Sequence, residues 1–262
     1  MAWLTRRRVR RYGQKGRLVV FLLVVGTFLQ WCFSGVYWSA SRASTMPRHA
    51  LVVTAHPDDE CMFFGPVIQT LVRANVTVSA LCLSEGNAEG LGSLRRHELF
   101  ASYHALGVPN DHVTCLDDPQ LPDSMELTWD PEHIRQLLLS YLSYRDIDTI
   151  ITFDHQGVSL HPNHKAVYHG VQAMQARWPA EHGSRPKVWA LVTLSWRSKF
   201  LGYLASMGQL ASTYDVLILT PWATYWQSLM AMRQHASQLV WFRYLYVLCS
   251  SYMHANAFRT MT

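Results

Sequence analysis

Six short apolar runs within residues 50–219 constrain the fold of this 262-residue chain more than any other feature. The first run, ALVVTA at residues 50–55, is typical of a strand that is buried on both faces of a sheet. The other runs cover residues 76–83, 113–116, 148–153, 188–194 and 215–219. Because helical patterns separate most of these runs, the sequence predicts an α/β domain with a mostly parallel sheet flanked by helices.

The last apolar segment, residues 222–253, carries many aromatic side chains at helical spacing. This spacing predicts helices whose aromatic residues belong mostly to the core. A second interpretation is that part of the segment lies against a lipid bilayer. The aromatic residues concerned are Trp222, Trp226, Trp241, Phe242 and Tyr246.

The first 48 residues differ from the rest of the chain in charge and hydropathy. Residues 1–17 form an arm with seven basic side chains and no acidic one, and residues 18–38 carry no charge. A helix rises about 1.5 Å per residue, so this apolar run can cross a bilayer core of about 30 Å. The sequence therefore predicts one transmembrane anchor, a linker at residues 39–48 and a domain at residues 49–262. A cleaved signal peptide and a buried core helix are the alternative interpretations.

Outside the basic arm the chain is nearly neutral, with 16 basic and 18 acidic side chains. A basic surface for nucleic acid is therefore not needed to explain the net charge of +5. Because the arm adjoins an apolar run, the expected partner is the membrane and not nucleic acid. The five cysteines include no CxxC pair, which excludes a ribbon-type zinc site.

Three sequence features disagree about the side of the membrane on which the domain lies. The basic arm favours a cytosolic N-terminus and a domain on the far side of the membrane. Asn75, Val76 and Thr77 form a glycosylation sequon, which is used only on the lumenal side. The odd number of cysteines favours a reducing compartment instead.

Two polar motifs follow two of the apolar runs. HPDDE occupies residues 56–60, directly after the first run, and HPNH occupies residues 161–164, shortly after the fourth. In a parallel sheet the carboxyl ends of the strands meet at one edge, where ligands bind. We therefore expect the two motifs to converge, although about 100 residues separate them.

The side chains of these motifs suit a metal-dependent hydrolase. His56, His161 and His164 offer imidazoles, and Asp58 and Asp59 offer carboxylates. Two histidines and one aspartate can bind a divalent ion such as Zn²⁺ and leave one position open for water. The second aspartate can then act on that water as a base. Each motif alone also has a simpler interpretation, since adjacent aspartates can cap a helix and a proline can begin one.

The motif AHPDDE after a short apolar strand, with HPNH downstream, resembles the LmbE-like de-N-acetylase family. The resemblance extends over residues 48–258 and includes the loop at residues 84–87 and the segment TFDHQGVSLHPNH at residues 152–164. The tail HASQLVWFRYLYVLCSSYM at residues 235–253, together with the apolar N-terminus, resembles the eukaryotic branch of that family. This branch acts on N-acetylglucosaminylphosphatidylinositol in GPI-anchor biosynthesis.

The resemblance implies a Rossmann-like domain and one divalent metal ion of the zinc type. It implies that His56, Asp59 and His164 bind the ion and that Asp58 is the general base. His161 would polarise the acetyl carbonyl, stabilise the oxyanion or protonate the leaving amine.

The resemblance also implies two substrate-binding residues, Arg95 and Asp154. Arg95 matches an arginine that lies near the substrate, although a surface ion pair with Glu98 is an equally open interpretation. Asn163 stands where many bacterial members have aspartate, so it supplies no carboxylate to orient His161. Either Asp154 takes over that task or no residue does, which leaves the protonation state of His161 open.

The implied activity is hydrolysis of the N-acetyl group of N-acetylglucosaminylphosphatidylinositol, a glycolipid of the endoplasmic reticulum membrane. A water deprotonated by Asp58 would attack the acetyl carbonyl, His161 would stabilise the oxyanion, and acetate would be released. The resemblance implies a domain that faces the cytosol, in conflict with the charge rule and the sequon. The alternatives are a de-N-acetylase for another N-acetylglucosaminyl conjugate and a catalytically silent membrane scaffold.

Overall fold

The computed structural model describes residues 17, 19–26, 29, 37–40, 46–202 and 214–261, with residues 37–40 described by their backbone alone. The chain divides into two compact units, Met1–Gly35 and Val36–Thr262. The second unit contains the sheet and both polar motifs. The predicted basic arm lies outside the described residues except for Arg17.

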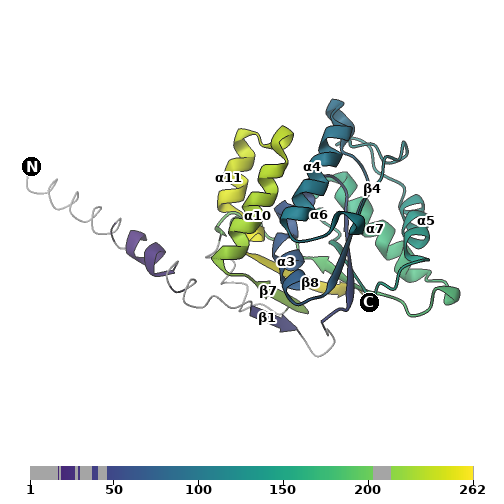
Figure 1. Cartoon of the computed structure of the whole chain (residues 1–262), viewed down its shortest axis with the longest axis horizontal. Coiled ribbons are helices and arrows are strands. Elements are labelled where there is room, and N and C mark those ends of the chain that lie inside the picture. The colour runs from purple at the N-terminus through teal and green to yellow at the C-terminus, as the bar shows by residue number, and fades with distance from the viewer. Residues whose placement is uncertain are drawn as a thin grey trace, which may run out of the picture. The chain divides into compact units, whose positions relative to one another are not determined.

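The second unit is built on one eight-stranded sheet with the strand order β1-β7-β8-β6-β5-β2-β3-β4 (Figure 1). The five neighbouring strands β4, β3, β2, β5 and β6 are parallel to one another. The other three strands extend the sheet beyond β6 with antiparallel pairs: β8 pairs with β6, β7 with β8, and β1 with β7. The predicted α/β fold with a mostly parallel sheet is therefore confirmed, with an antiparallel extension on one side. The strands are β1 (Tyr37–Ala40), β2 (His49–Thr54), β3 (Thr77–Cys82), β4 (Val113–Cys115), β5 (Thr149–Phe153), β6 (Lys187–Leu191), β7 (Val216–Leu219) and β8 (Ala255–Met261).

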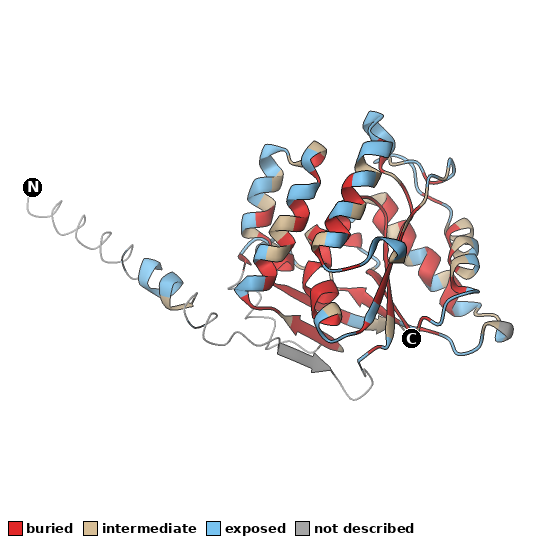
Figure 2. Ribbon diagram, in the orientation of Figure 1, coloured by how far each residue is buried: buried red, intermediate tan, exposed pale blue. Residues whose placement is uncertain are grey.

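Helices flank this sheet, as expected for parallel strands that are buried on both faces. Helix α7 packs on β5 and β2 and contacts α5, while α3 packs on β3, β7 and β8 and contacts α10. The core strands β2 and β5 are buried along almost their whole length (Figure 2). Among the described residues of this unit, the α-helices are α2 (Asp59–Phe63), α3 (Gly65–Arg73), α4 (Gly92–Ala105), α5 (Pro131–Leu142), α6 (Gly157–Leu160), α7 (Pro162–Ala176), α8 (Trp196–Lys199), α10 (Trp222–Gln234) and α11 (Trp241–Cys249).

Strand β8 was not predicted from the sequence. Its segment ANAFRTM has no alternation of apolar and polar residues, and alanine and asparagine are poor strand formers. The strand forms because its backbone completes the hydrogen bonds of β6 and β7, between which it lies. A tertiary environment of this kind leaves little local signal in the sequence.

The predicted anchor is corrected at its carboxyl end, because Tyr37–Ala40 forms the edge strand β1 and not the end of a helix. Edge pairing with β7 satisfies backbone groups that an apolar helix would satisfy internally. Of the rest of the predicted anchor, residues 19–26 and 29 are described and are helical. Among the described residues, we find no helix with the length and apolar character needed to cross a bilayer.

The prediction that the aromatic residues of the tail are mostly core is wrong. Trp222, Trp226, Trp241 and Phe242 are all exposed, and Tyr246 alone of the five is largely covered. The predicted helices are present, but their exposed aromatic side chains face away from the core.

Candidate active site

The two polar motifs converge at the carboxyl edge of the sheet, as the sequence predicts. Their strands β2 and β5 are direct parallel neighbours, so the loops that follow them emerge side by side. The ring of His56 lies 4.9 Å from that of His161 and 5.5 Å from that of His164. One nitrogen of each ring lies within 4.8 Å of a nitrogen of the other two.

Asp59 is fixed beside His164 by the turn that begins α2. One of its carboxylate oxygens, Oδ2, accepts hydrogen bonds from the backbone N–H groups of Ala55 and His56, at 3.0 and 2.9 Å. The other oxygen, Oδ1, lies 3.2 Å from Nε2 of His164. Burial works to raise the pKa of Asp59, but His164 outweighs it and holds that pKa below its usual range.

The contact between Asp59 and His164 brings together two groups that can bind a metal ion. His164 Nδ1 lies 3.0 Å from the carbonyl oxygen of Gly157 and therefore carries the proton in the neutral ring. Its Nε2 then presents a lone pair to a carboxylate oxygen, a repulsive arrangement unless a proton or a cation lies between them. The donors present, imidazole nitrogen and carboxylate oxygen, are ligands that zinc-type ions bind in proteins.

His56 is oriented by two partners at its Nε2 atom. Asp123 Oδ1 lies 3.2 Å away, and the side-chain amide of Asn163 lies 3.0 Å away with its oxygen toward the ring. Both partners are acceptors, so Nε2 is the protonated nitrogen and Nδ1 keeps the lone pair that a metal ligand needs. Histidine ligands are commonly oriented by such acceptors at the second ring nitrogen.

His161 is arranged as a hydrogen-bond donor. Its Nδ1 accepts a hydrogen bond from the backbone N–H of Asn163 at 3.2 Å, which places the proton of the neutral ring on Nε2. Burial, and then the neighbouring His164, lower the pKa of His161, so the neutral ring is favoured. A ring that already uses the Nδ1 lone pair and protonates Nε2 is a poor metal ligand, which favours Asp59 over His161 as the third ligand.

Asp58 is held in an unusual backbone conformation and paired with a cation. Its φ angle is 103°, a left-handed value that costs energy in a residue with a side chain. Arg243 of α11 forms an ion pair with Asp58 through Nη1 and Oδ2. Burial raises the pKa of Asp58 although Arg243 acts to lower it. Sequence reasoning could not find this pair, because 185 residues separate its members and no local pattern links them.

A buried ion pair behind Asp58 supports its backbone. Glu60 accepts hydrogen bonds from the backbone N–H of Asp58 at 3.0 Å, from the hydroxyl of Ser102 at 2.5 Å and from His235 Nε2 at 2.6 Å. Burial opposes both charges, but the attraction between them prevails, lowering the pKa of Glu60 and raising that of His235. The pair thus anchors the strained turn at Asp58 from a side that a substrate does not reach.

Arg95 lies inside the site and not on the helix surface. Its guanidinium donates to the carbonyl oxygens of Pro57 and Gly86, and its Nη1 lies 3.2 Å from Asp123 Oδ2. The alternative ion pair with Glu98 is excluded, because Glu98 accepts hydrogen bonds from Ser237 and Gln238 instead. Asp123, which the sequence analysis missed, therefore links Arg95 to His56.

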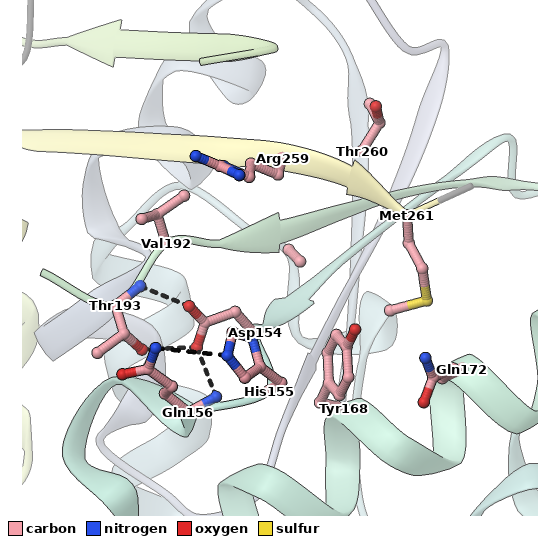
Figure 3. A pocket seen from close by; sticks show the side chains of 11 residues that line it. Asp154, His155, Gln156, Tyr168, Gln172, Val192, Thr193, Arg259, Thr260 and Met261 are labelled. Carbon is pink, nitrogen blue, oxygen red and sulfur yellow. Dashed lines mark hydrogen bonds between the residues drawn. The ribbon is translucent and has the colours of Figure 1, made fainter. Parts of the chain in front are cut away.

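Asp154 positions a loop and is not seen to orient His161. Its Oδ1 accepts hydrogen bonds from the backbone of Gln156 and Gly157 and from the hydroxyl of Thr193, and Oδ2 accepts from the backbone of Thr193 (Figure 3). Both oxygens are therefore already occupied, and the carboxylate ties the loop before α7 to the segment after β6. This loop also lines one side of a pocket of about 570 Å³. The three histidines of the site are not among the residues that line this pocket.

Comparison with known proteins places the chain in a family. Residues 51–175 match the family described as "PIG-L: GlcNAc-PI de-N-acetylase". The chain is 37% identical to a probable N-acetylglucosaminyl-phosphatidylinositol de-N-acetylase of Schizosaccharomyces pombe, over 81% of this chain and 86% of the relative. It is 35% identical to the N-acetylglucosaminyl-phosphatidylinositol de-N-acetylase of Bos taurus, over 84% and 90% of the two chains.

Among solved structures, the fold is similar to that of the N,N'-diacetylchitobiose deacetylase of Pyrococcus horikoshii. The TM-score is 0.61 at 19% identity, and the match covers 82% of this chain and 84% of the other. At that identity the similarity concerns the fold alone. The sequence relatives, at 37% and 35% identity over most of both chains, lead to one conclusion: this chain belongs to the GlcNAc-PI de-N-acetylase family.

Proposed function

We propose that the chain hydrolyses the N-acetyl group of N-acetylglucosaminylphosphatidylinositol, giving glucosaminylphosphatidylinositol and acetate in the second step of GPI-anchor biosynthesis. The observation that carries the proposal is the convergence of Asp58, Asp59 and the three histidines at the ends of β2 and β5. The names of the relatives from Schizosaccharomyces pombe and Bos taurus support the choice of substrate.

The donor set fits a divalent metal ion of the zinc type. His56, Asp59 and His164 would hold it, because Asp59 lies 3.2 Å from Nε2 of His164 and the rings of His56 and His164 lie 5.5 Å apart. When bound, such an ion supplies Lewis acidity to an oxygen that lies next to it.

The side chains flanking these ligands would divide the proton transfers. Asp58 accepts a proton from water, whose oxygen forms a bond to the acetyl carbon. His161 donates a hydrogen bond from Nε2–H to the acetyl oxygen as negative charge develops there, a contribution commonly worth about 3 kcal/mol per donor. The carbon–nitrogen bond then breaks, the proton held by Asp58 passes to the leaving amine, and acetate is released. Arg243 keeps the Asp58 carboxylate in place before the proton arrives.

Acetate release from the glycolipid, measured with and without a chelator, tests this proposal. We expect Asp58→Asn to lose most of the turnover but to retain metal, and His164→Ala to lose both. His169→Ala is the matched control, because His169 is an exposed histidine on the same helix, α7. Full activity in both site variants would overturn the assignment, and a wild-type chain without turnover would favour a silent scaffold. A soluble N-acetylglucosaminyl conjugate in a parallel assay distinguishes the alternative substrate class.

We further propose that the protein acts at the endoplasmic reticulum membrane, with the apolar run before Tyr37 as its single-pass anchor and the domain facing the cytosol. Asn75 provides the test, because it is exposed in the turn before β3 and accessible to modification. In cells, we expect no change in electrophoretic mobility on treatment with an endoglycosidase. A glycan that disappears in Asn75→Gln would reverse the proposed orientation.

A further inference from the structure

Helix α11 has its apolar stripe on the outside. Trp241, Tyr244, Leu245 and Leu248 follow the i, i+3, i+4, i+7 spacing of one helix face and are 74%, 57%, 54% and 67% exposed. Phe242, beside this stripe, is 54% exposed. In a soluble domain such a stripe normally faces the core. An exposed apolar surface of this kind marks an interaction site.

The opposite face of α11 belongs to the active site. Arg243 pairs with Asp58, Tyr246 donates a hydrogen bond to the carbonyl of Met62 at 3.2 Å, and Val247 is buried in the core. The helix is therefore fixed in rotation by its inner contacts. Its apolar stripe is exposed because the inner face already has partners, and not because the helix is loosely attached.

Exposed apolar side chains also lie on α8 and just after it, in a segment that contacts α11. The ring of Phe200, just after α8, lies 6.2 Å from that of Tyr246, and the hydroxyl of Ser251 donates to the carbonyl of Ser198 at 2.5 Å. Trp196 and Leu201 in this segment are 76% and 60% exposed. The outer stripe of α11 and these two residues are together called the apolar face below.

The charge of the surrounding sequence indicates what covers this face. Residues 182–262 contain seven lysine and arginine residues and one acidic residue, Asp215. Asp215 is occupied by the backbone and hydroxyl of Thr260. Exposed tryptophan, tyrosine and leucine side chains, in a stretch of sequence that is rich in cationic and poor in anionic residues, complement the interface of a bilayer that contains anionic phospholipid.

We propose that the apolar face docks on the surface of a phospholipid bilayer, with α11 lying in the interface and its Arg243 side toward the active site. This proposal rests on the proposed function in one respect: a substrate carried by a lipid explains why the helix that docks on the membrane also lines the catalytic site. Docking places the opening of the site at the membrane surface, so that the headgroup reaches Asp58 while the acyl chains stay in the bilayer.

An environment-sensitive fluorophore at residue 248 tests docking without any assay of activity. The full chain carries Leu248→Cys, with Cys32 and Cys249 replaced by serine because the other three cysteines are buried. Tyr144→Cys, at a site that is 89% exposed beyond α5, is the matched control. The protein is placed with vesicles of phosphatidylcholine and phosphatidylinositol, with and without brominated phosphatidylcholine.

We expect the label at residue 248 to shift to the blue with vesicles and to be quenched by brominated lipid, and the label at residue 144 to do neither. Equal quenching at both positions, or none at 248, would overturn the proposal. A blue shift that is present before vesicles are added and that grows with protein concentration would show that a second copy of the chain covers the apolar face, and not a bilayer. A blue shift that depends neither on vesicles nor on protein concentration would show that another segment of the same chain covers the apolar face.

Activity gives a second and separable test. We expect Leu248→Glu to lower turnover of vesicle-borne glycolipid about tenfold relative to Tyr144→Glu, because one apolar anchor is lost. Turnover of the water-soluble headgroup, N-acetylglucosaminyl-inositol phosphate, should be unchanged. Unchanged activity on vesicles would count against docking, whereas a wild-type chain inactive on both substrates would count against the proposed function and leave the fluorescence result standing. If Leu248→Glu lost both activities, Trp241→Ser would replace it, with the same expectations.

Discussion

Gly157 offers a direct test of how closely the loop before α7 positions His164. Its φ angle is +65°, and its carbonyl oxygen lies 3.0 Å from His164 Nδ1. A Cβ atom added at Gly157 would lie 2.7 Å from the Cβ of His164 and 3.1 Å from the backbone nitrogen of Lys165. Because these separations are too short for non-bonded atoms, Gly157→Ala must displace either the loop or the first turn of α7.

Two costs follow from this substitution. The left-handed conformation costs a residue with a side chain about 1–2 kcal/mol. Crowding of a packed site typically adds about 1–3 kcal/mol. We therefore expect Gly157→Ala to lower the free energy of unfolding by about 2–5 kcal/mol. Since outer partners of metal ligands commonly matter about 10–100-fold, we expect a loss of turnover in that range.

Gly90→Ala separates the two costs. Gly90 has a left-handed conformation with φ 74° and ψ 15°, but no atom lies within 4 Å of its added Cβ. This control therefore carries the backbone cost without the crowding, and its turnover should remain within about twofold of wild type. Urea unfolding and acetate release measure both quantities. If Gly157→Ala lost no more stability than Gly90→Ala and kept full turnover, the loop would not position His164 as we infer.

Three further predictions follow from other contacts of the domain. Arg243→Met leaves burial unopposed at Asp58 and raises its pKa, so the acid limb of the pH–rate profile should move up by about 1–2 units, whereas Arg243→Lys should move it little. Asp123→Asn weakens the partner of His56 and should lower metal affinity about tenfold in competition with a chelator. Burial lowers the pKa of His254 to about 4, so below pH ~6.5 the unfolded chain binds more protons than the folded one. The contribution of His254 to stability should therefore fall by about 3 kcal/mol between pH 6.5 and pH 4, so His254→Phe should lose about 3 kcal/mol less than the wild-type chain over this range in urea titrations.

The position of the site could be predicted because it depends on local signals and one rule of topology. Short apolar runs identify β2 and β5 as buried strands, and the polar motifs follow them directly. In parallel sheets the carboxyl ends of strands share one edge, so the motifs had to meet there if the two strands were close. His56, Asp59 and His164 are brought together for that reason.

The partners of these residues could not be predicted in the same way. His235 lies 175 residues from Glu60, and Arg243 lies 185 residues from Asp58. Neither belongs to a motif, and each reaches the site only because the helices of the tail pack against α2. Asp123 belongs to the loop between β4 and α5 and reaches the site through its contacts with His56 and Arg95. The sequence could therefore indicate which groups meet at the edge of the sheet but not which groups hold them in place.

The exposed apolar side chains of α11 show how a helix that faces a bilayer can be told from a helix that faces the core. A stripe of apolar residues at helical spacing minimises contact with water, and a protein core and a bilayer produce the same stripe. The difference lies in the rest of the helix. α11 carries one charged residue, Arg243, and a buried aspartate attracts that charge inward. Because Arg243 must face the protein, the helix geometry places the apolar stripe on the outside. Exposing this stripe to water would cost free energy. An apolar helix whose only charge is needed inside is thus expected to have a second apolar phase to meet, and in this protein we infer that phase to be lipid.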